Sequence, residues 1–136
     1  MTQHYKILLV EDNPNDVELL RMALREADVD CELKVIDDGG DALAFVEHED
    51  APESRPDLAI LDLNLPRRDG MEVLHGMRGN PLFSDVPVAV LSSSALPRER
   101  ARMEALHIRR YLLKPSDLEE FMKIGGEVKE LLAESR

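Results

Sequence analysis

Short apolar runs rich in Val, Ile and Leu recur along the chain, separated by longer segments of mixed character. The five runs are residues 7–10, 33–36, 58–61, 86–91 and 111–113. Each run is continuous rather than alternating, which is typical of strands buried on both faces of a sheet. The pattern therefore predicts five buried strands.

The segments between these runs carry apolar residues at helical spacing. Val17, Leu20 and Leu24 stand at i, i+3 and i+7, and similar spacing predicts further helices around residues 42–46, 71–77, 101–106 and 118–132. Strands that alternate with helices form right-handed βαβ units. The fold class we expect is α/β, with a five-stranded parallel sheet that is doubly wound and flavodoxin-like, (βα)5.

Acidic residues stand where two of the runs end. Glu11 and Asp12 close the first run, and Asp62 closes the third. The carboxyl ends of parallel strands share one edge of a sheet, where such folds place their working site. Any one of these acids could be an ordinary solvated loop residue, but three together repel one another and favour a hard cation. The sequence predicts a Mg²⁺ site, with Mn²⁺ possible.

Two donors stand at the ends of the remaining candidate strands. Ser92 closes the fourth run and Lys114 closes the fifth. A carboxylate that attacks phosphorus needs its charge screened, a metal for the incoming oxygens, and donors for the others. A hydroxyl and an ammonium beside the acids meet that need, so we expect phosphoryl chemistry at this edge.

Four motifs in order resemble a response-regulator receiver domain, the phosphoacceptor half of a two-component system. They are residues 7–13 (ILLVEDN), 61–66 (LDLNLP), 90–94 (VLSSS) and 111–115 (YLLKP). The resemblance covers nearly the whole chain. It implies a single receiver domain over residues 1–136 with no output domain, so that the output is a contact with another protein.

The resemblance also implies roles for the acids. Asp62 becomes the aspartyl phosphate, and Asp12 and Asp62 ligate Mg²⁺. The backbone carbonyl of Asn64 completes the protein ligands, and Glu11 acts on the metal directly or through water. Glu11 stands where this family more often has Asp, and the exchange keeps a carboxylate at the site.

The donors and one aromatic residue take the remaining implied roles. Ser92 and Lys114 hold the phosphoryl oxygens, and Ser92 with Tyr111 forms the switch that reports phosphorylation. The alternative for Tyr111 is plain packing on the sheet with its hydroxyl in water. The protein would assist its own phosphorylation and dephosphorylation without being an enzyme for external substrates.

A narrower resemblance concerns the last third of the chain. Residues 106–108, 111, 117–119, 121 and 123–124 are similar to stand-alone regulators paired with bacterial phytochrome-type histidine kinases, as is the long loop expected over residues 47–56. It implies a sensor histidine kinase as partner, and a homodimer through the last two helices and last strand. Gly125 and Gly126 interrupt the last helix at about 1 kcal/mol each relative to Ala, so either close packing offsets that cost or the helix bends there.

Composition excludes several classes of function. The chain has 136 residues, with 17 Lys and Arg against 28 Asp and Glu, a net charge of −11 that argues against nucleic-acid binding. No apolar stretch approaches the roughly 20 residues that span a bilayer, and the amino terminus is too polar for a signal peptide. We therefore expect a cytoplasmic protein without membrane contact.

Two other functions remain as alternatives. A phosphatase or phosphotransferase working through an aspartyl phosphate would need a second acid shortly after Asp62, where Asn64 offers an amide. A flavodoxin-like cofactor-binding protein would need a glycine-containing phosphate loop after the first strand. Residues 11–14 (EDNP) are acidic there and contain no Gly.

Overall fold

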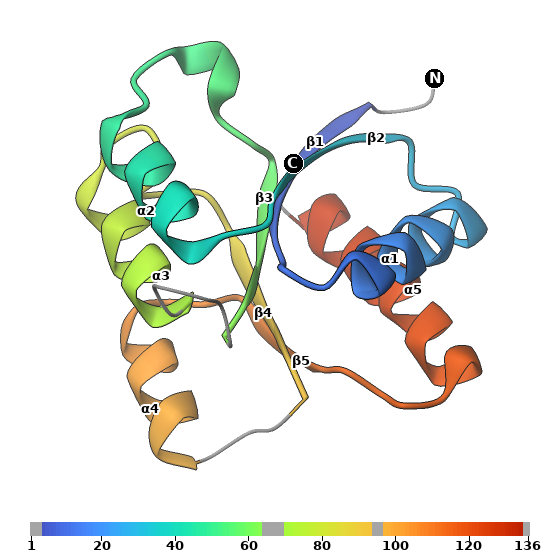
Figure 1. The fold of residues 1–136 in the computed structure, drawn as a ribbon. Helices are drawn as coiled ribbons and strands as arrows, with labels where there is room; N and C mark the ends of the chain where they lie inside the picture. The colour runs from blue at the N-terminus through green and yellow to red at the C-terminus, as the bar shows by residue number, and fades with distance from the viewer. Residues whose placement is uncertain (1–3, 64–69, 94–96, 135–136) are drawn as a thin grey trace.

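Five parallel strands form one sheet in the computed structural model, which describes residues 4–63, 70–93 and 97–134 (Figure 1). The strand order is β2-β1-β3-β4-β5. The strands are β1 (Tyr5–Val10), β2 (Cys31–Ile36), β3 (Leu58–Asp62), β4 (Val88–Ser92) and β5 (Arg110–Leu113). The helices are α1 (Pro14–Glu26), α2 (Gly39–His48), α3 (Gly70–Gly79), α4 (Pro97–Ala105) and α5 (Leu118–Glu134). The predicted doubly wound α/β fold is confirmed.

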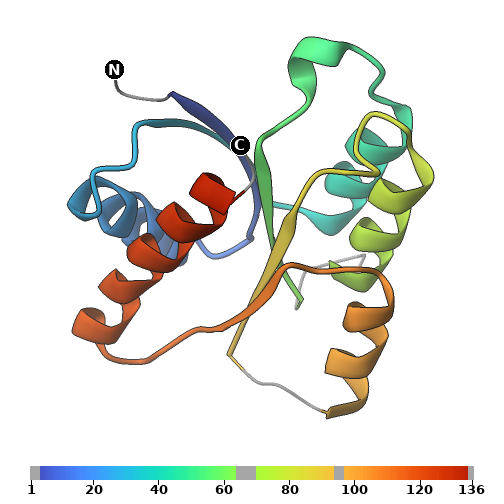
Figure 2. The same cartoon turned by 180° about the vertical axis from the view of Figure 1, so that it is seen from behind.

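Helices cover both faces of the sheet. Helices α1 and α5 lie on one face and α2, α3 and α4 on the other, as the two opposite views show (Figures 1 and 2). Two buried apolar clusters result, because successive strand residues point to opposite faces: Leu9 belongs to one cluster and Leu8 and Val10 to the other. Within the described ranges no helix is both long and apolar enough to cross a bilayer.

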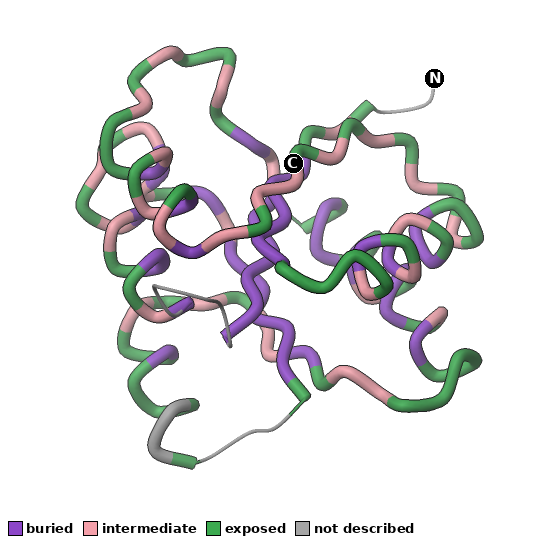
Figure 3. The backbone as a smooth tube through the Cα atoms, in the orientation of Figure 1, coloured by how far each residue is buried: buried purple, intermediate pink, exposed green. Residues whose placement is uncertain are grey.

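The inner and edge strands differ in burial (Figure 3). Every residue of β3 and β4 is buried, as is the carboxyl-terminal part of β1, as the continuous apolar runs predict. The prediction of full burial was wrong for β2, whose residues alternate between half-buried and exposed over most of its length, and for β5. Both are edge strands, with a neighbour on one side only.

Some element boundaries also differ from the sequence pattern. Strand β4 begins at Val88 rather than at residue 86, because the Val86 N–H closes a turn on the Phe83 carbonyl at 3.0 Å and Pro87 has no N–H. Helix α4 begins at Pro97, before the predicted residues 101–106, since proline suits the first turn of a helix.

The strand order places a switch point between β1 and β3. The chain leaves β1 toward β2 on one side, whereas later strands add on the other side through β3. The connections after β1 and β3 therefore lead to helices on opposite faces, which opens a crevice at the carboxyl ends of these strands. The segments that carry the three predicted acids both end at this crevice.

The two glycines of α5 have different surroundings. A Cβ on Gly125 would overlap the carbonyl oxygen of Ala23 in α1, whereas nothing lies within 4 Å of a Cβ on Gly126. Helix α5 continues through both residues. Gly125 thus permits α5 to pack closely against α1. This packing explains why a residue with low helix propensity stands at position 125, but it does not explain Gly126.

We expect opposite effects from the two alanine substitutions. Gly125→Ala forces α1 and α5 apart and should lower the free energy of unfolding by about 2 kcal/mol or more. Gly126→Ala meets no atom and should raise it by about 1 kcal/mol, because Ala favours the helix. Urea unfolding of both variants measures this difference, and equal effects would contradict the packing role of Gly125.

Candidate functional site

The three predicted acids come together at the crevice. Glu11, Asp12 and Asp62 each offer a carboxylate oxygen, and these oxygens lie within 4.8 Å of one another. Glu11 and Asp62 are buried, whereas Asp12 is exposed. Such a group of hard oxygen ligands, with one side open to solvent, is the kind of site in which Mg²⁺ keeps part of its water shell.

Lys114 reaches into this cluster from the residue that follows β5. Its ammonium donates to Glu11 Oε1 at 2.8 Å, to Asp16 Oδ2 at 2.9 Å and to Asp62 Oδ2 at 3.2 Å. The Lys114 N–H also donates to the Ser92 carbonyl at 2.7 Å, which continues the pairing of β4 with β5. The predicted proximity of Lys114 to the acids is present in the structure.

Asp16 is the site residue that the sequence reasoning missed. The predicted site residues all stand at strand ends, whereas Asp16 lies in the first turn of α1. Asn13 caps this helix by accepting from the Asn15 N–H at 2.9 Å, and Pro14 occupies the first turn. Because α1 starts at Pro14, two residues after Asp12, its first turn stays at the same edge of the sheet, but nothing in the local sequence distinguishes Asp16 from an ordinary first-turn acid.

Burial sets the electrostatics of the cluster. Desolvation, reinforced by the neighbouring Asp62 carboxyl, raises the pKa of Glu11 to about 9 despite the Lys114 ammonium. Burial would lower the pKa of Lys114, but its bonds to Glu11 and Asp16 outweigh that and raise it. The site therefore disfavours a further negative charge and retains its positive one.

One buried oxygen of Glu11 fits a cation. Glu11 Oε1 accepts from Lys114, but Oε2 has no hydrogen-bond partner within the described part of the chain. A buried acceptor without a partner is costly, and a divalent ion bound by these carboxylates would satisfy it. The donor set, all carboxylate oxygen, suits Mg²⁺ or Mn²⁺.

The remaining predicted residues are placed as follows. Ser92 ends β4 and is 1% exposed. Tyr111 of β5 is partly buried and packs against the cluster under α2, α3 and α4, with the Arg100 guanidinium carbon 5.1 Å from its ring centroid. Asn64, the predicted carbonyl ligand, lies outside the described residues.

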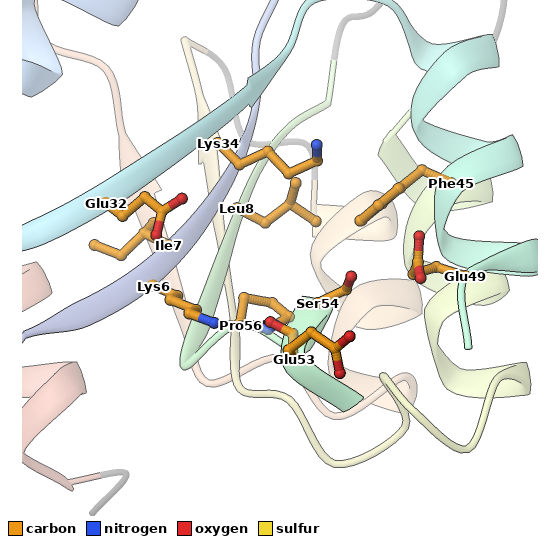
Figure 4. Close-up of a pocket in the computed structure, with 10 residues that line it drawn as sticks. All are labelled: Lys6, Ile7, Leu8, Glu32, Lys34, Phe45, Glu49, Glu53, Ser54 and Pro56. Atoms are coloured by element: carbon orange, nitrogen blue, oxygen red, sulfur yellow. Dashed lines mark hydrogen bonds between the residues drawn. The ribbon is translucent and has the colours of Figure 1, made fainter. Parts of the chain in front are cut away.

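A separate cavity of about 260 Å³ lies between β1, β2, α2 and the 3-10 turn Pro52–Ser54 (Figure 4). Its two ammonium groups already have partners: Lys6 donates to the Glu53 carbonyl at 2.8 Å, and Lys34 lies 5.0 Å from the Phe45 ring centroid. It contains none of the acids of the crevice. Lys6 therefore ties the 3-10 turn Pro52–Ser54 to β1, and the acids that suit a metal lie at the crevice instead.

A buried carboxylate beside a lysine, at the switch point of a parallel sheet, is the arrangement that phosphoryl transfer to a carboxylate requires. The model of the family described as the response regulator receiver domain matches residues 7–124. The chain therefore belongs to this family, as its four motifs predict. It is a receiver domain of two-component signalling and not a member of a catalytic enzyme family.

Individual relatives resemble the chain over most of its length. Response regulator Rcp1 of Synechocystis sp. (strain ATCC 27184 / PCC 6803 / Kazusa) is 39% identical over 122 residues, which cover 87% of this chain and 82% of Rcp1. The crystal structure of the phosphorylated cyanobacterial phytochrome response regulator RcpA matches with a TM-score of 0.85 at 36% identity, covering 98% of this chain and 97% of RcpA. The Mn²⁺-bound form of Rcp1 matches with a TM-score of 0.81 at 36% identity, covering 93% and 92%.

The metal assignment follows from these findings. Receiver domains bind Mg²⁺ or Mn²⁺, and the chain has the acidic cluster that such an ion needs. Glu11, Asp12 and Asp62 are the residues whose oxygens would hold the ion.

We expect Asp12→Ala to weaken Mg²⁺ binding by roughly tenfold or more, because it removes a carboxylate ligand. Asp50→Ala removes the same charge from an exposed position after α2 and serves as the control. Calorimetric titration with Mg²⁺ compares the two. Equal affinities would refute the role of Asp12.

Proposed function

We propose that the protein is a Mg²⁺-dependent phosphoacceptor in which Asp62 receives a phosphoryl group from a sensor histidine kinase. One observation carries this proposal: the Lys114 ammonium lies 3.2 Å from Asp62 Oδ2 while that carboxylate sits in the three-acid cluster. An oxygen of Asp62 bonds to phosphorus as the donor's bond to phosphorus breaks, and the electron pair of that bond leaves with the donor.

The other site residues support this transfer. Mg²⁺, when bound, supplies positive charge to the phosphoryl oxygens. Glu11, Asp12 and Asp62 hold the ion, and we include the Asn64 carbonyl as a further ligand. Lys114 donates to a phosphoryl oxygen, and the Ser92 hydroxyl donates to another. The same groups assist the protein's own phosphorylation and dephosphorylation.

We further propose a phytochrome-type histidine kinase as the partner. The support is the similarity to RcpA, which is a cyanobacterial phytochrome response regulator, at 36% identity over nearly the whole of both chains. The output is a contact with a downstream protein. A homodimer through α4, β5 and α5 is the accompanying assembly, and the exposed Leu113 of β5, at 58% exposure, offers it an apolar contact.

Asp62→Asn should abolish phosphorylation, because an amide oxygen is a far weaker nucleophile than a carboxylate. Incubation with Mg²⁺ and acetyl phosphate, followed by intact-mass measurement, should show one base-labile phosphoryl adduct on the unmodified protein. Asp50→Asn makes the same change of charge away from the site and should leave the adduct intact. Retention of the adduct in Asp62→Asn would overturn the assignment.

Tyr111→Ala should leave phosphorylation of Asp62 intact but remove most of the structural response to it. The physical reason is that the ring of Tyr111 in β5 packs against Arg100 of α4, while β5 pairs with β4, whose last residue is Ser92. Amide hydrogen exchange of β4, α4 and β5, before and after phosphorylation, measures the response. Tyr5→Ala, at the far end of the sheet, is the matched control, and an unchanged response in Tyr111→Ala would contradict the switch role.

A further inference from the structure

The ammonium of Lys114 uses all its donors. A lysine ammonium has three N–H groups, and Lys114 has three carboxylate acceptors at 2.8, 2.9 and 3.2 Å. Two of the acceptors, Glu11 and Asp62, belong to the acidic cluster that would hold the metal. The third, Asp16, comes from α1 and is not part of that cluster.

Asp16 is well placed to hold a cation in a fixed position. Its side chain is 19% exposed and that of Lys114 is 14% exposed, so water screens this pair only weakly. The first turn of a helix favours a negative charge, because the free N–H groups give it a positive end. Helix α1, which carries Asp16, is itself fixed in position, because it packs closely along α5 where Ala23 meets Gly125.

We propose that Asp16 is a positioning residue that anchors Lys114 for phosphoryl binding at Asp62, an inference that rests on the proposed function. When Asp62 takes a phosphoryl group, the oxygen that it shares with phosphorus loses its negative charge. The third N–H of Lys114 then passes from Asp62 to a phosphoryl oxygen. Glu11 and Asp16 keep the other two N–H groups, so the ammonium needs no new position.

A simple charge effect of Asp16 would have the opposite sign. If Asp16 only added negative potential, Asp16→Asn would reduce the repulsion of an incoming phosphodonor and speed up phosphorylation. If Asp16 anchors Lys114, the same substitution lets the long Lys114 side chain move away from the position in which it binds the phosphoryl group. Phosphorylation then slows. The direction of the change therefore separates the two roles.

Rates of Mg²⁺-dependent phosphorylation by acetyl phosphate test this inference, together with the lifetime of the adduct. Asp16→Asn should slow phosphorylation by about tenfold, the worth of one charge-assisted hydrogen bond. Asp16→Glu retains the charge and should restore part of the rate. Glu18→Gln is the matched control: Glu18 lies on the same helix, is 67% exposed and pairs with Arg21 at 3.6 Å, so its rate should stay within about twofold of the unmodified protein.

A double-mutant cycle shows whether Asp16 acts through Lys114. In a Lys114→Ala background, Asp16→Asn should have no further effect on the phosphorylation rate, whereas an effect through folding or general potential would persist. Circular dichroism checks that each variant is folded. Equal effects of Asp16→Asn with and without Lys114 would overturn the anchoring role.

The outcomes separate this inference from the proposed function. Absence of an adduct on the unmodified protein would overturn the phosphoacceptor assignment and the anchoring role with it. A normal adduct on the unmodified protein, with Asp16→Asn as fast as Glu18→Gln or faster, would overturn the anchoring role alone.

Discussion

The ion pairing of Lys114 with carboxylates at the edge of the sheet is the interaction on which the rest of the site depends. Glu11, Asp12, Asp16 and Asp62 bring four carboxyl groups to one crevice, and Lys114 is the cation that contacts three of them. Burial and the neighbouring Asp62 carboxyl raise the pKa of Glu11, so the crevice disfavours further negative charge. The described part of the chain brings one ammonium to these four carboxyl groups, so the site is suited to a divalent ion.

The fold makes this gathering of charge possible. Lys114 and Glu11 are 103 positions apart in the chain, and Lys114 and Asp62 are 52 apart. Parallel strands bring their carboxyl ends to one edge, and the adjacency of β1 and β3 places two acidic segments side by side. The apolar clusters on both faces fix the strands, so the cost of crowding the acids is met by packing elsewhere in the domain.

Much of this could be predicted from the sequence, for identifiable reasons. Continuous apolar runs mark all five strands, although only the inner ones are fully buried. The polar residues that follow the first, third and fifth runs mark the edge of the sheet where Glu11, Asp62 and Lys114 meet. What the pattern could not supply depends on contacts between distant elements. Asp16 is an ordinary first-turn acid until β5 brings Lys114 beside it. The reason for Gly125 is likewise not local, because it is the Ala23 carbonyl of α1 that excludes a side chain there.

The same contacts link the site to the surface through a short path. Lys114 follows β5 directly, and its N–H bonds to the carbonyl of Ser92, the last residue of β4. Three residues before Lys114, Tyr111 lies against Arg100 of α4.

A chain of contacts does not by itself couple two sites. Coupling requires an element with two arrangements, and both sites must favour one arrangement over the other. Within the proposed function, that element is Tyr111 with α4, because the Lys114 end is held by three acids while the Tyr111 ring is only partly buried. Anchoring the Lys114 end of β5 while Tyr111 changes its packing against α4 would confine the response to phosphorylation to the α4 side of the sheet.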